Sequence, residues 1–125
     1  MANPNIAAVS AIYGNTFTSL LTTTSPTEIV SNAASSGKVY KINSIVVSNV
    51  DGSAAADITI NLYTVAGLGG TATAIASTIS VPADSTLIVT DKTTSFYLLE
   101  NKSIGAVASA ANDLVVTASW EEINA

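Results

Sequence analysis

Short runs of alternating apolar and polar residues, separated by turn-forming residues, constrain this chain more than any other feature. In the clearest run, 57–65, Ile58, Ile60 and Leu62 alternate with Thr59, Asn61 and Tyr63. Such runs recur about every 8–12 residues, and no segment keeps a helical period. The pattern predicts an all-β, single-domain fold, a β-sandwich or jelly roll of about eight short antiparallel strands.

The run 37–52 is predicted to be the long central strand of a sheet. Four apolar residues share even positions and predict one buried face: Tyr40, Ile42, Val46 and Val50. Ile45 and Val47 break the alternation, so the middle of this strand is expected to be covered on both faces. The closing pair Asp51-Gly52 is typical of a hairpin turn, and we therefore expect the strand at 57–65 to pair with the central strand.

The first 26 residues differ from the rest of the chain. They carry no charge, and their larger apolar residues, Ile6, Val9, Ile12 and Phe17, are irregularly spaced. Two interpretations remain open for residues 1–26. They form either an arm that packs against a neighbouring subunit, for example as an added strand, or the first hairpin of the sandwich. Residues 27–125 are predicted to form the β-sandwich domain.

The composition excludes several classes of site. The 125-residue chain has no cysteine and no histidine, so triads or dyads with a histidine base and transition-metal sites with such ligands are excluded. Ser36 with Lys38 is formally a dyad, but serine is too common here for that to be informative. The net charge of −5 and four scattered lysines argue against nucleic-acid binding. No apolar run is long enough to span a bilayer, and no secretory signal is recognisable.

The carboxylates suggest neither catalysis nor metal binding. Asp51, Asp57, Asp84 and Asp91 fall at predicted turns, where aspartate bonds to its own backbone, and their spacing does not match a calcium loop. Glu121 and Glu122 are neighbours on a predicted strand, so their side chains point to opposite faces. We expect no catalytic residue, no metal site and no cofactor.

Charged residues make up only 10% of the chain, against about 25% in an average soluble domain. One interpretation is a secreted or surface protein with a surface rich in Ser and Thr. The other is a subunit whose surface is largely covered by neighbours, because interface cores are depleted in charge. The second interpretation is preferred.

Six segments together give a family resemblance: Met1–Asn5, Lys41–Gly52, Ala56–Ile60, Ile79–Asp84, Tyr97–Glu100 and Ser119–Glu122. The chain resembles small virion structural proteins of tailed phages, especially phages that infect marine cyanobacteria. The resemblance implies a capsid decoration (cement) subunit or a neck or tail component. It carries no functional residue over to this chain.

The predicted function is therefore a non-enzymatic virion subunit, most simply a decoration protein, assembled in the host cytoplasm. Its expected partners are copies of itself, most simply as a homotrimer, and the major capsid protein or other virion proteins, without nucleic acid or membrane. The residues predicted to lie in interfaces are Ile6, Val9, Ile12, Phe17, Tyr63 and Trp120. The alternative is a glycan-binding adhesin module, in which Trp120 with Tyr40 or Tyr63 forms a sugar-stacking platform; the strand parity of Trp120 favours a core or interface role.

Overall fold

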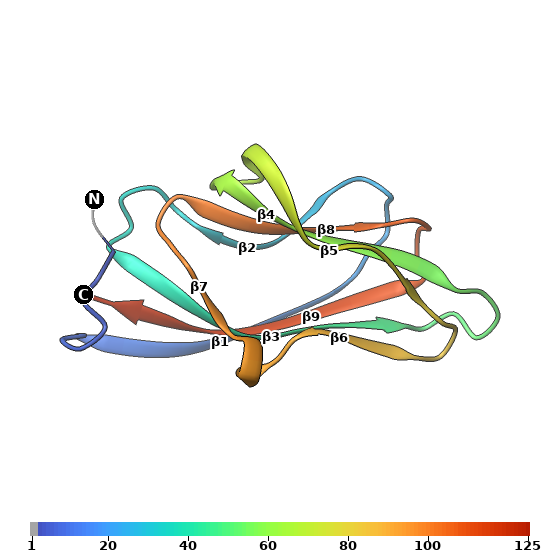
Figure 1. The fold of residues 1–125 in the computed structure, drawn as a ribbon, viewed down its shortest axis with the longest axis horizontal. Helices are drawn as coiled ribbons and strands as arrows, with labels where there is room; N and C mark the ends of the chain where they lie inside the picture. The colour runs from blue at the N-terminus through green and yellow to red at the C-terminus, as the bar shows by residue number, and fades with distance from the viewer. Residues whose placement is uncertain (1–2) are drawn as a thin grey trace.

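The computed structural model describes residues 3–125, which form a two-layered all-β fold (Figure 1). The strands are β1 (Ala11–Leu20), β2 (Thr27–Asn32), β3 (Lys38–Asn49), β4 (Ala56–Val65), β5 (Gly69–Val81), β6 (Thr86–Thr90), β7 (Phe96–Leu98), β8 (Lys102–Ala108) and β9 (Leu114–Asn124), and the short 3-10 helix η1 (Lys92–Thr94) precedes β7. The predicted all-β sandwich is confirmed. The predicted count of about eight strands is exceeded by one because residues 11–20 also form a strand.

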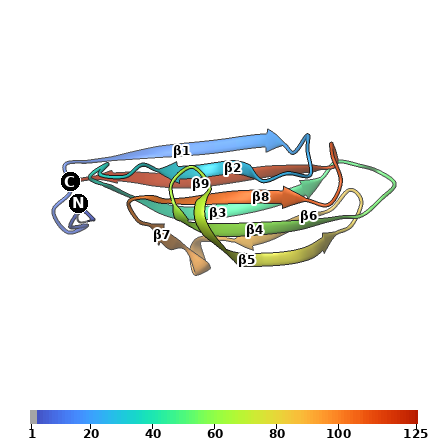
Figure 2. The same cartoon turned by 90° about the horizontal axis from the view of Figure 1, so that it is seen from above.

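Two antiparallel sheets face each other. The five-stranded sheet has the order β1-β9-β3-β6, with β7 also paired to β3, and the four-stranded sheet has the order β2-β8-β4-β5. Figure 1 shows them as a lower and an upper layer, and Figure 2 shows β1 along one border of the molecule. Among these paired strands only β4 and β5 follow each other in the sequence, so the topology depends on pairing between distant segments.

The long strand β3 is central in its sheet, as predicted, but its two halves have opposite parity. Its register against β9 shifts between Ile42 and Ser44, which leaves Asn43 as an extra residue. Ile42 therefore points into the core, and so do Ile45 and Val47, which follow the shift. The expectation that Val46 and Val50 are buried is wrong, because the β-bulge reverses the alternation at Asn43.

The Asp51-Gly52 segment joins the two layers and does not close a hairpin. β3 pairs with β6, β7 and β9, whereas β4 pairs with β5 and β8 in the opposite sheet. The predicted pairing of 57–65 with the central strand is therefore wrong. The turn chemistry was identified correctly, since the Asp51 carboxylate accepts hydrogen bonds from the Ser53 N–H and hydroxyl. The resulting turn carries the chain from one sheet to the other.

Two buried asparagines tie the sheets together. From β2, the Asn32 amide donates to the carbonyl oxygens of Lys38 and Leu98 in the five-stranded sheet. From β3, the Asn49 amide donates to the carbonyl oxygens of Ala54 and Val81, the latter in the four-stranded sheet. Each side chain thus donates a hydrogen bond to at least one backbone carbonyl of the opposite sheet. A buried carbonyl without a hydrogen-bond donor would be costly.

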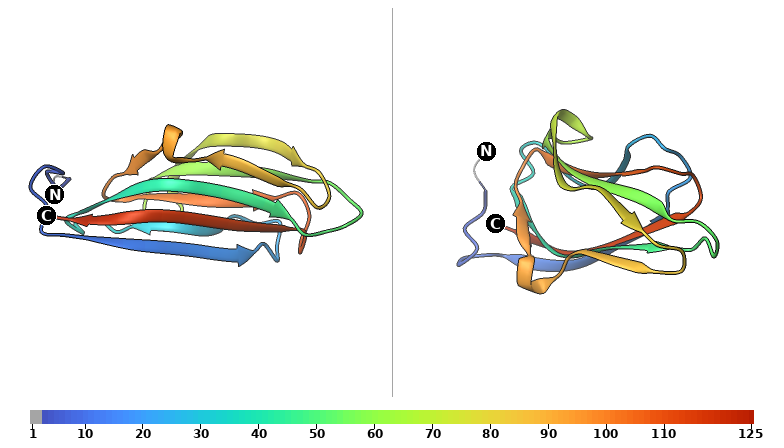
Figure 3. Two further views of the ribbon diagram at one scale, coloured as in Figure 1. Left: turned by 90° about the horizontal axis from the view of Figure 1, so that it is seen from below. Right: turned by 45° about the vertical axis from the view of Figure 1, so that its right-hand side comes forward.

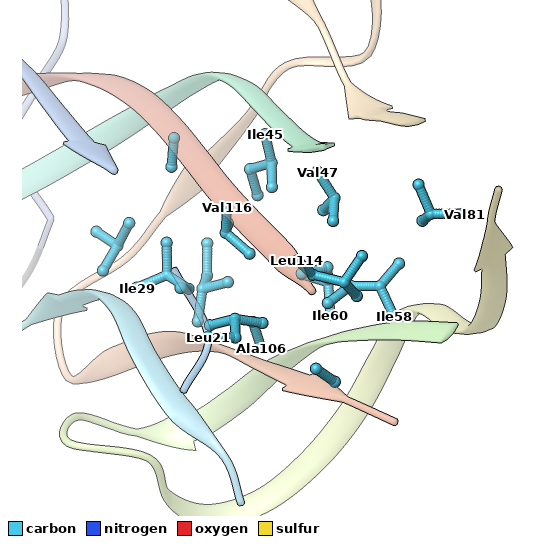
Figure 4. Close-up of a cluster of buried hydrophobic side chains, with 14 of the residues drawn as sticks. Leu21, Ile29, Ile45, Val47, Ile58, Ile60, Val81, Ala106, Leu114 and Val116 are labelled. Atoms are coloured by element: carbon cyan, nitrogen blue, oxygen red, sulfur yellow. The ribbon is translucent and has the colours of Figure 1, made fainter. Parts of the chain in front are cut away.

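The core between the layers is built mainly from branched aliphatic side chains. Figure 4 shows Ile45, Val47, Leu114 and Val116 of the five-stranded sheet together with Ile58, Ile60 and Ala106 of the four-stranded sheet, all fully or almost fully buried. Burial of each large aliphatic side chain contributes about 1.5–3 kcal/mol relative to exposure. The core is continuous through the sandwich, so residues 27–125 have no second hydrophobic centre within the described range.

The β4–β5 hairpin tip folds back over the outer face of the four-stranded sheet. The Leu68 N–H donates to the Ser103 hydroxyl, and the Gly67 N–H donates to the hydroxyl of Ser31 on β2. A Cβ atom built on Gly105 would lie 2.8 Å from Leu68 Cδ2 and 2.9 Å from Tyr63 Cε2. The glycine at 105 is therefore what lets the tip lie flat on β8.

The N-terminal segment contributes β1 to the five-stranded sheet. From Ala11 to Leu20 this strand pairs with β9 of the same chain without a register shift, and Phe17 packs against the core. It is not part of a hairpin, because β2 lies in the other sheet. Residues 1 and 2 of the predicted N-terminal segment lie outside the described residues. The division of the chain at residue 26 stays a prediction.

Replacing Asn49 with Ala is expected to lower the free energy of unfolding by about 1–3 kcal/mol, because the carbonyls of Ala54 and Val81 lose their donor. Urea unfolding followed by circular dichroism measures the change. Asn61→Ala is the matched control: within residues 3–125 the Asn61 side chain makes no hydrogen bond, and its loss should cost less than about 0.5 kcal/mol. Equal losses for the two variants contradict the tying role of Asn49.

Replacing Gly105 with Ala should destabilise the fold by about 1–3 kcal/mol, since the new methyl group overlaps Leu68 and Tyr63. The cost should fall when Leu68 is also replaced by Ala, because one of the two overlapping side chains is then shortened. A double-mutant cycle of the two substitutions measures this coupling. Additive losses would mean that the tip does not press on β8.

Candidate functional site

The part of the molecule described by the structure offers neither a pocket nor a ligand cluster. No pocket is found on its surface, and residues 3–125 contain no group of three acidic side chains placed to hold a metal ion. The helical segment within this range, η1, is three residues long, and no helix there can cross a membrane. Exposed surfaces are therefore the features on which a functional site can be built.

The turn aspartates are engaged in local hydrogen bonds. The Asp51 carboxylate accepts from the Ser53 N–H and hydroxyl, and these bonds hold the pKa of Asp51 below its ordinary value of 3.8. The Asp91 carboxylate caps η1 by accepting from the Thr93 hydroxyl and N–H, which likewise lowers the pKa of Asp91. Asp57 lies within β4, outside the turn where the sequence placed it. The four aspartates therefore do not form a site.

An aromatic and ionic cluster occupies the inner face of the five-stranded sheet near the chain termini. The rings of Tyr40 and Trp120 stack with centroids 6.3 Å apart and planes inclined by 22°. Nearby, Lys38 forms an ion pair with Glu122, and the hydrogen bond to Glu122 raises the pKa of Lys38 above 10.5. Burial raises the pKa of Tyr40 above 10.0.

This cluster does not provide the predicted sugar-stacking platform. Both rings are half-buried, they stack on each other, and they pack against the hydrophobic core. Tyr63 lies in the opposite sheet and is covered by Leu68, with 7% of its surface exposed. The structure thus brings Tyr40 and Trp120 together but keeps Tyr63 apart from both.

The six residues predicted to form interfaces lie in different environments. Ile6 and Ile12 are each 54% exposed, and Val9 is half-buried. Phe17 and Trp120 pack against the core, and Tyr63 is buried. The two exposed isoleucines remain available to a partner, whereas the other four already have contacts within the chain. A role for any of them in an interface stays a prediction.

The outer face of the five-stranded sheet is a broad, weakly charged surface. The outward side chains of β1, β9, β3 and β6 are Ser, Thr, Gly and aliphatic residues, except for Lys41 and Glu121, which are opposite each other in register. Three exposed apolar residues on this outer face were missed from the sequence: Leu20, Ile88 and Tyr97. The alternation in 86–90 contained a signal for Ile88, because burying Leu87 and Val89 leaves Ile88 on the outer face.

Comparison with known proteins shows only the fold. No family model and no curated protein sequence matches the chain. A solved structure described under Bacillus endospore appendages that form disulfide-linked pili is 18% identical, with a TM-score of 0.52, covering 98% of this chain and 97% of that one. A chain of the acid-stable capsid of Helicobacter pylori bacteriophage KHP30 is 10% identical, with a TM-score of 0.54. The alignment covers 93% of this chain and 90% of the capsid chain.

A third similar structure belongs to a much longer chain. It comes from the T13 particle of infectious bursal disease virus, with 11% identity and a TM-score of 0.51. The alignment covers 91% of this chain but only 31% of the viral one. At these identities the likeness establishes a shared sandwich architecture, and function has to be argued from the surfaces.

The free energy of unfolding should change little between about pH 5 and pH 9, because the chain has no histidine. The folded pKa values of Asp51 and Asp91 are lowered. The stabilisation by these carboxylates is therefore complete above pH 3.8 and is lost as the pH falls below that value. Stabilisation by Lys38 is complete below 10.5 and is lost as the pH rises through its raised pKa.

Thermal unfolding midpoints measured from below pH 3.8 to above pH 10.5 check the expectation. Asp91→Asn should reduce the loss of stability in acid, and Glu28→Gln, which alters an exposed carboxylate, is the control. A steep change of the unfolding midpoint near neutral pH would contradict the expected pH dependence.

Proposed function

We propose that the protein is a non-enzymatic structural subunit of a phage virion, and specifically a capsid decoration (cement) protein. The observation that carries the proposal is the outer face of the five-stranded sheet, which is broad, nearly free of charge and dotted with exposed apolar residues. Removing such a surface from water against another protein requires little desolvation of charge. The absence of any pocket in the described residues fits a subunit better than an enzyme.

The fold neighbours support this proposal without deciding it. Two of the three similar structures come from viral capsids or particles, and the third comes from an appendage. Pili, capsids and viral particles are all ordered protein assemblies. The disulfide linkage named for the appendage protein is unavailable to this chain, which has no cysteine. Its assembly contacts therefore do not include disulfides.

The type of particle, the place of its assembly and the partners are inferred from the sequence. The resemblance to virion proteins of tailed phages, including those of marine cyanobacteria, implies a particle assembled in the host cytoplasm. Its partners are then the major capsid protein or other virion proteins and further copies of itself. For these copies the sequence favours a homotrimer, whereas the free edge of β1 favours a twofold pair. A neck or tail position and a glycan-binding adhesin are the alternatives that the experiment has to separate.

Electron microscopy of virions labelled with gold-conjugated antibody tests the position in the particle. A decoration protein gives label spread over the whole capsid surface. Label confined to the tail or to one vertex assigns the protein to the neck or tail, and absence from virions together with glycan binding supports the adhesin. Either of these results overturns the decoration role.

A charge substitution tests which surface contacts the particle. Ile88→Lys places an ammonium group on the outer face of the five-stranded sheet, where Ile88 is 60% exposed. It should fold normally but rebind stripped capsids at least about tenfold more weakly, since the new charge is buried without a partner. Ile75→Lys, on the four-stranded sheet, is the matched control and should rebind as the unmodified protein does. Equal rebinding by both variants contradicts the assignment of this face.

A further inference from the structure

β1 forms one border of the five-stranded sheet and has a free edge. Figures 2 and 3 show it along the outside of the molecule, and within residues 3–125 it pairs only with β9. It is a ten-residue strand without a register shift, a proline or a charged residue. Long, regular and uncharged edges of this kind present unpaired N–H and C=O groups that can pair with another chain.

The other edges of the two sheets carry features that discourage such pairing. β2 contains Glu28 and a register shift next to it. β5 has three register shifts against β4, and Thr78 adopts a positive φ of 51°. β6 and β7 have five and three residues, and η1 separates them. Bulges, inserted charges and short strands are the usual protections of a sheet edge, and β1 has none of them.

The register defines which backbone groups of β1 face outward. The Leu21 N–H donates to the Leu114 carbonyl oxygen, which continues the β1–β9 ladder. In an antiparallel pair such bonded positions alternate, so the odd-numbered residues of β1 bond to β9. The even-numbered residues, 12 to 20, direct their N–H and C=O groups to the free edge. Their side chains lie on the outer face of the sheet.

These even positions are symmetric about Thr16. Going outward, Gly14 and Thr18 flank Thr16, and Ile12 and Leu20 end the row. We propose that β1 pairs antiparallel with β1 of a second copy of this chain, about a twofold axis at Thr16. Ile12 then lies opposite Leu20 of the partner subunit, Gly14 opposite Thr18 of the partner subunit, and Thr16 opposite its own copy.

The pairing also joins apolar rows on the outer face. Within one chain, Ile123 lies beside both Val39 and Ile12 across the three strands β3, β9 and β1. At the other end of β1, Leu20 lies beside Val115. The twofold pair aligns these two rows, so that Ile12 and Leu20, which are 54% and 39% exposed in the single chain, cover each other across the junction.

This pattern favours β1 of a second copy as the strand that pairs with the free edge of β1. The match of Ile12 with Leu20 and of Gly14 with Thr18 arises only when the same strand meets itself in the opposite direction. An unrelated strand would satisfy the backbone groups but would not produce the continuous apolar row. The inference uses the edge of the sheet and does not depend on the proposed particle or on its contact face.

Single-cysteine variants test the pairing on a cysteine-free background. Opposed bonded residues have Cα atoms about 5.5 Å apart, within the range of a disulfide. Thr16→Cys should therefore form a covalent dimer on mild oxidation. Gly14→Cys and Thr18→Cys should cross-link when mixed and much less when each is alone, and a cysteine at 14 has open space. Thr73→Cys, on the exposed edge of β5, is the control and should stay monomeric.

The cross-linking and light-scattering results distinguish the possible partners of β1. Circular dichroism first checks that each variant is folded, and light scattering of the unmodified protein should show mass in multiples of two copies. If Thr16→Cys cross-links no faster than Thr73→Cys, the pairing is wrong. Preferential cross-linking of Thr16→Cys to Thr73→Cys would show a head-to-tail contact between β1 and β5, and a trimer in light scattering would show a threefold contact; both overturn the twofold pair.

Discussion

The extra residue in β3 is the constraint on which the rest of the fold depends. β3 pairs with β9 along its length, and with β7 and β6 on its other side, so its side chains set the inner face of the five-stranded sheet. The shift at Asn43 puts Ile42, Ile45 and Asn49 on that inner face. Without it, the second half of β3 would turn its apolar residues to solvent, and the Asn49 amide would face away from the four-stranded sheet.

The same bulge explains which surface is left for partners. Because Val46 points outward after the shift, it lies beside Ile88 of β6 on the outer face. Together with Leu20 at the border of the sheet, these residues make that face apolar, while the tip of the β4–β5 hairpin covers part of the opposite outer face. The four-stranded sheet also has exposed apolar residues, Val65, Ile75 and Ile79, so the two faces differ in how far the hairpin tip covers them.

The fold class could be predicted because alternation is a local property, as in Ile58, Ile60 and Leu62. Strand partners could not, because Asp51-Gly52 has the same local chemistry in a hairpin and in a turn that changes sheets; here the Asn49 side chain binds the carbonyl of Val81 from the other sheet and fixes the second outcome. β1 was uncertain because an edge strand alternates weakly: its outward positions are small or polar at Gly14, Thr16 and Thr18. Tyr63 was predicted to face a partner, and nothing local reveals that Leu68 covers it.

The pairing of β1 with β9 also orders events during synthesis of the chain. Ala11 of β1 lies opposite Asn124 of β9, so β1 leaves the ribosome long before its partner exists. Closing so long a loop is slow, and both edges of β1 remain unpaired until β9 is made. Nascent chains on one polysome therefore carry the same uncharged strand with both edges unpaired, and docking of β9 then covers one of these edges.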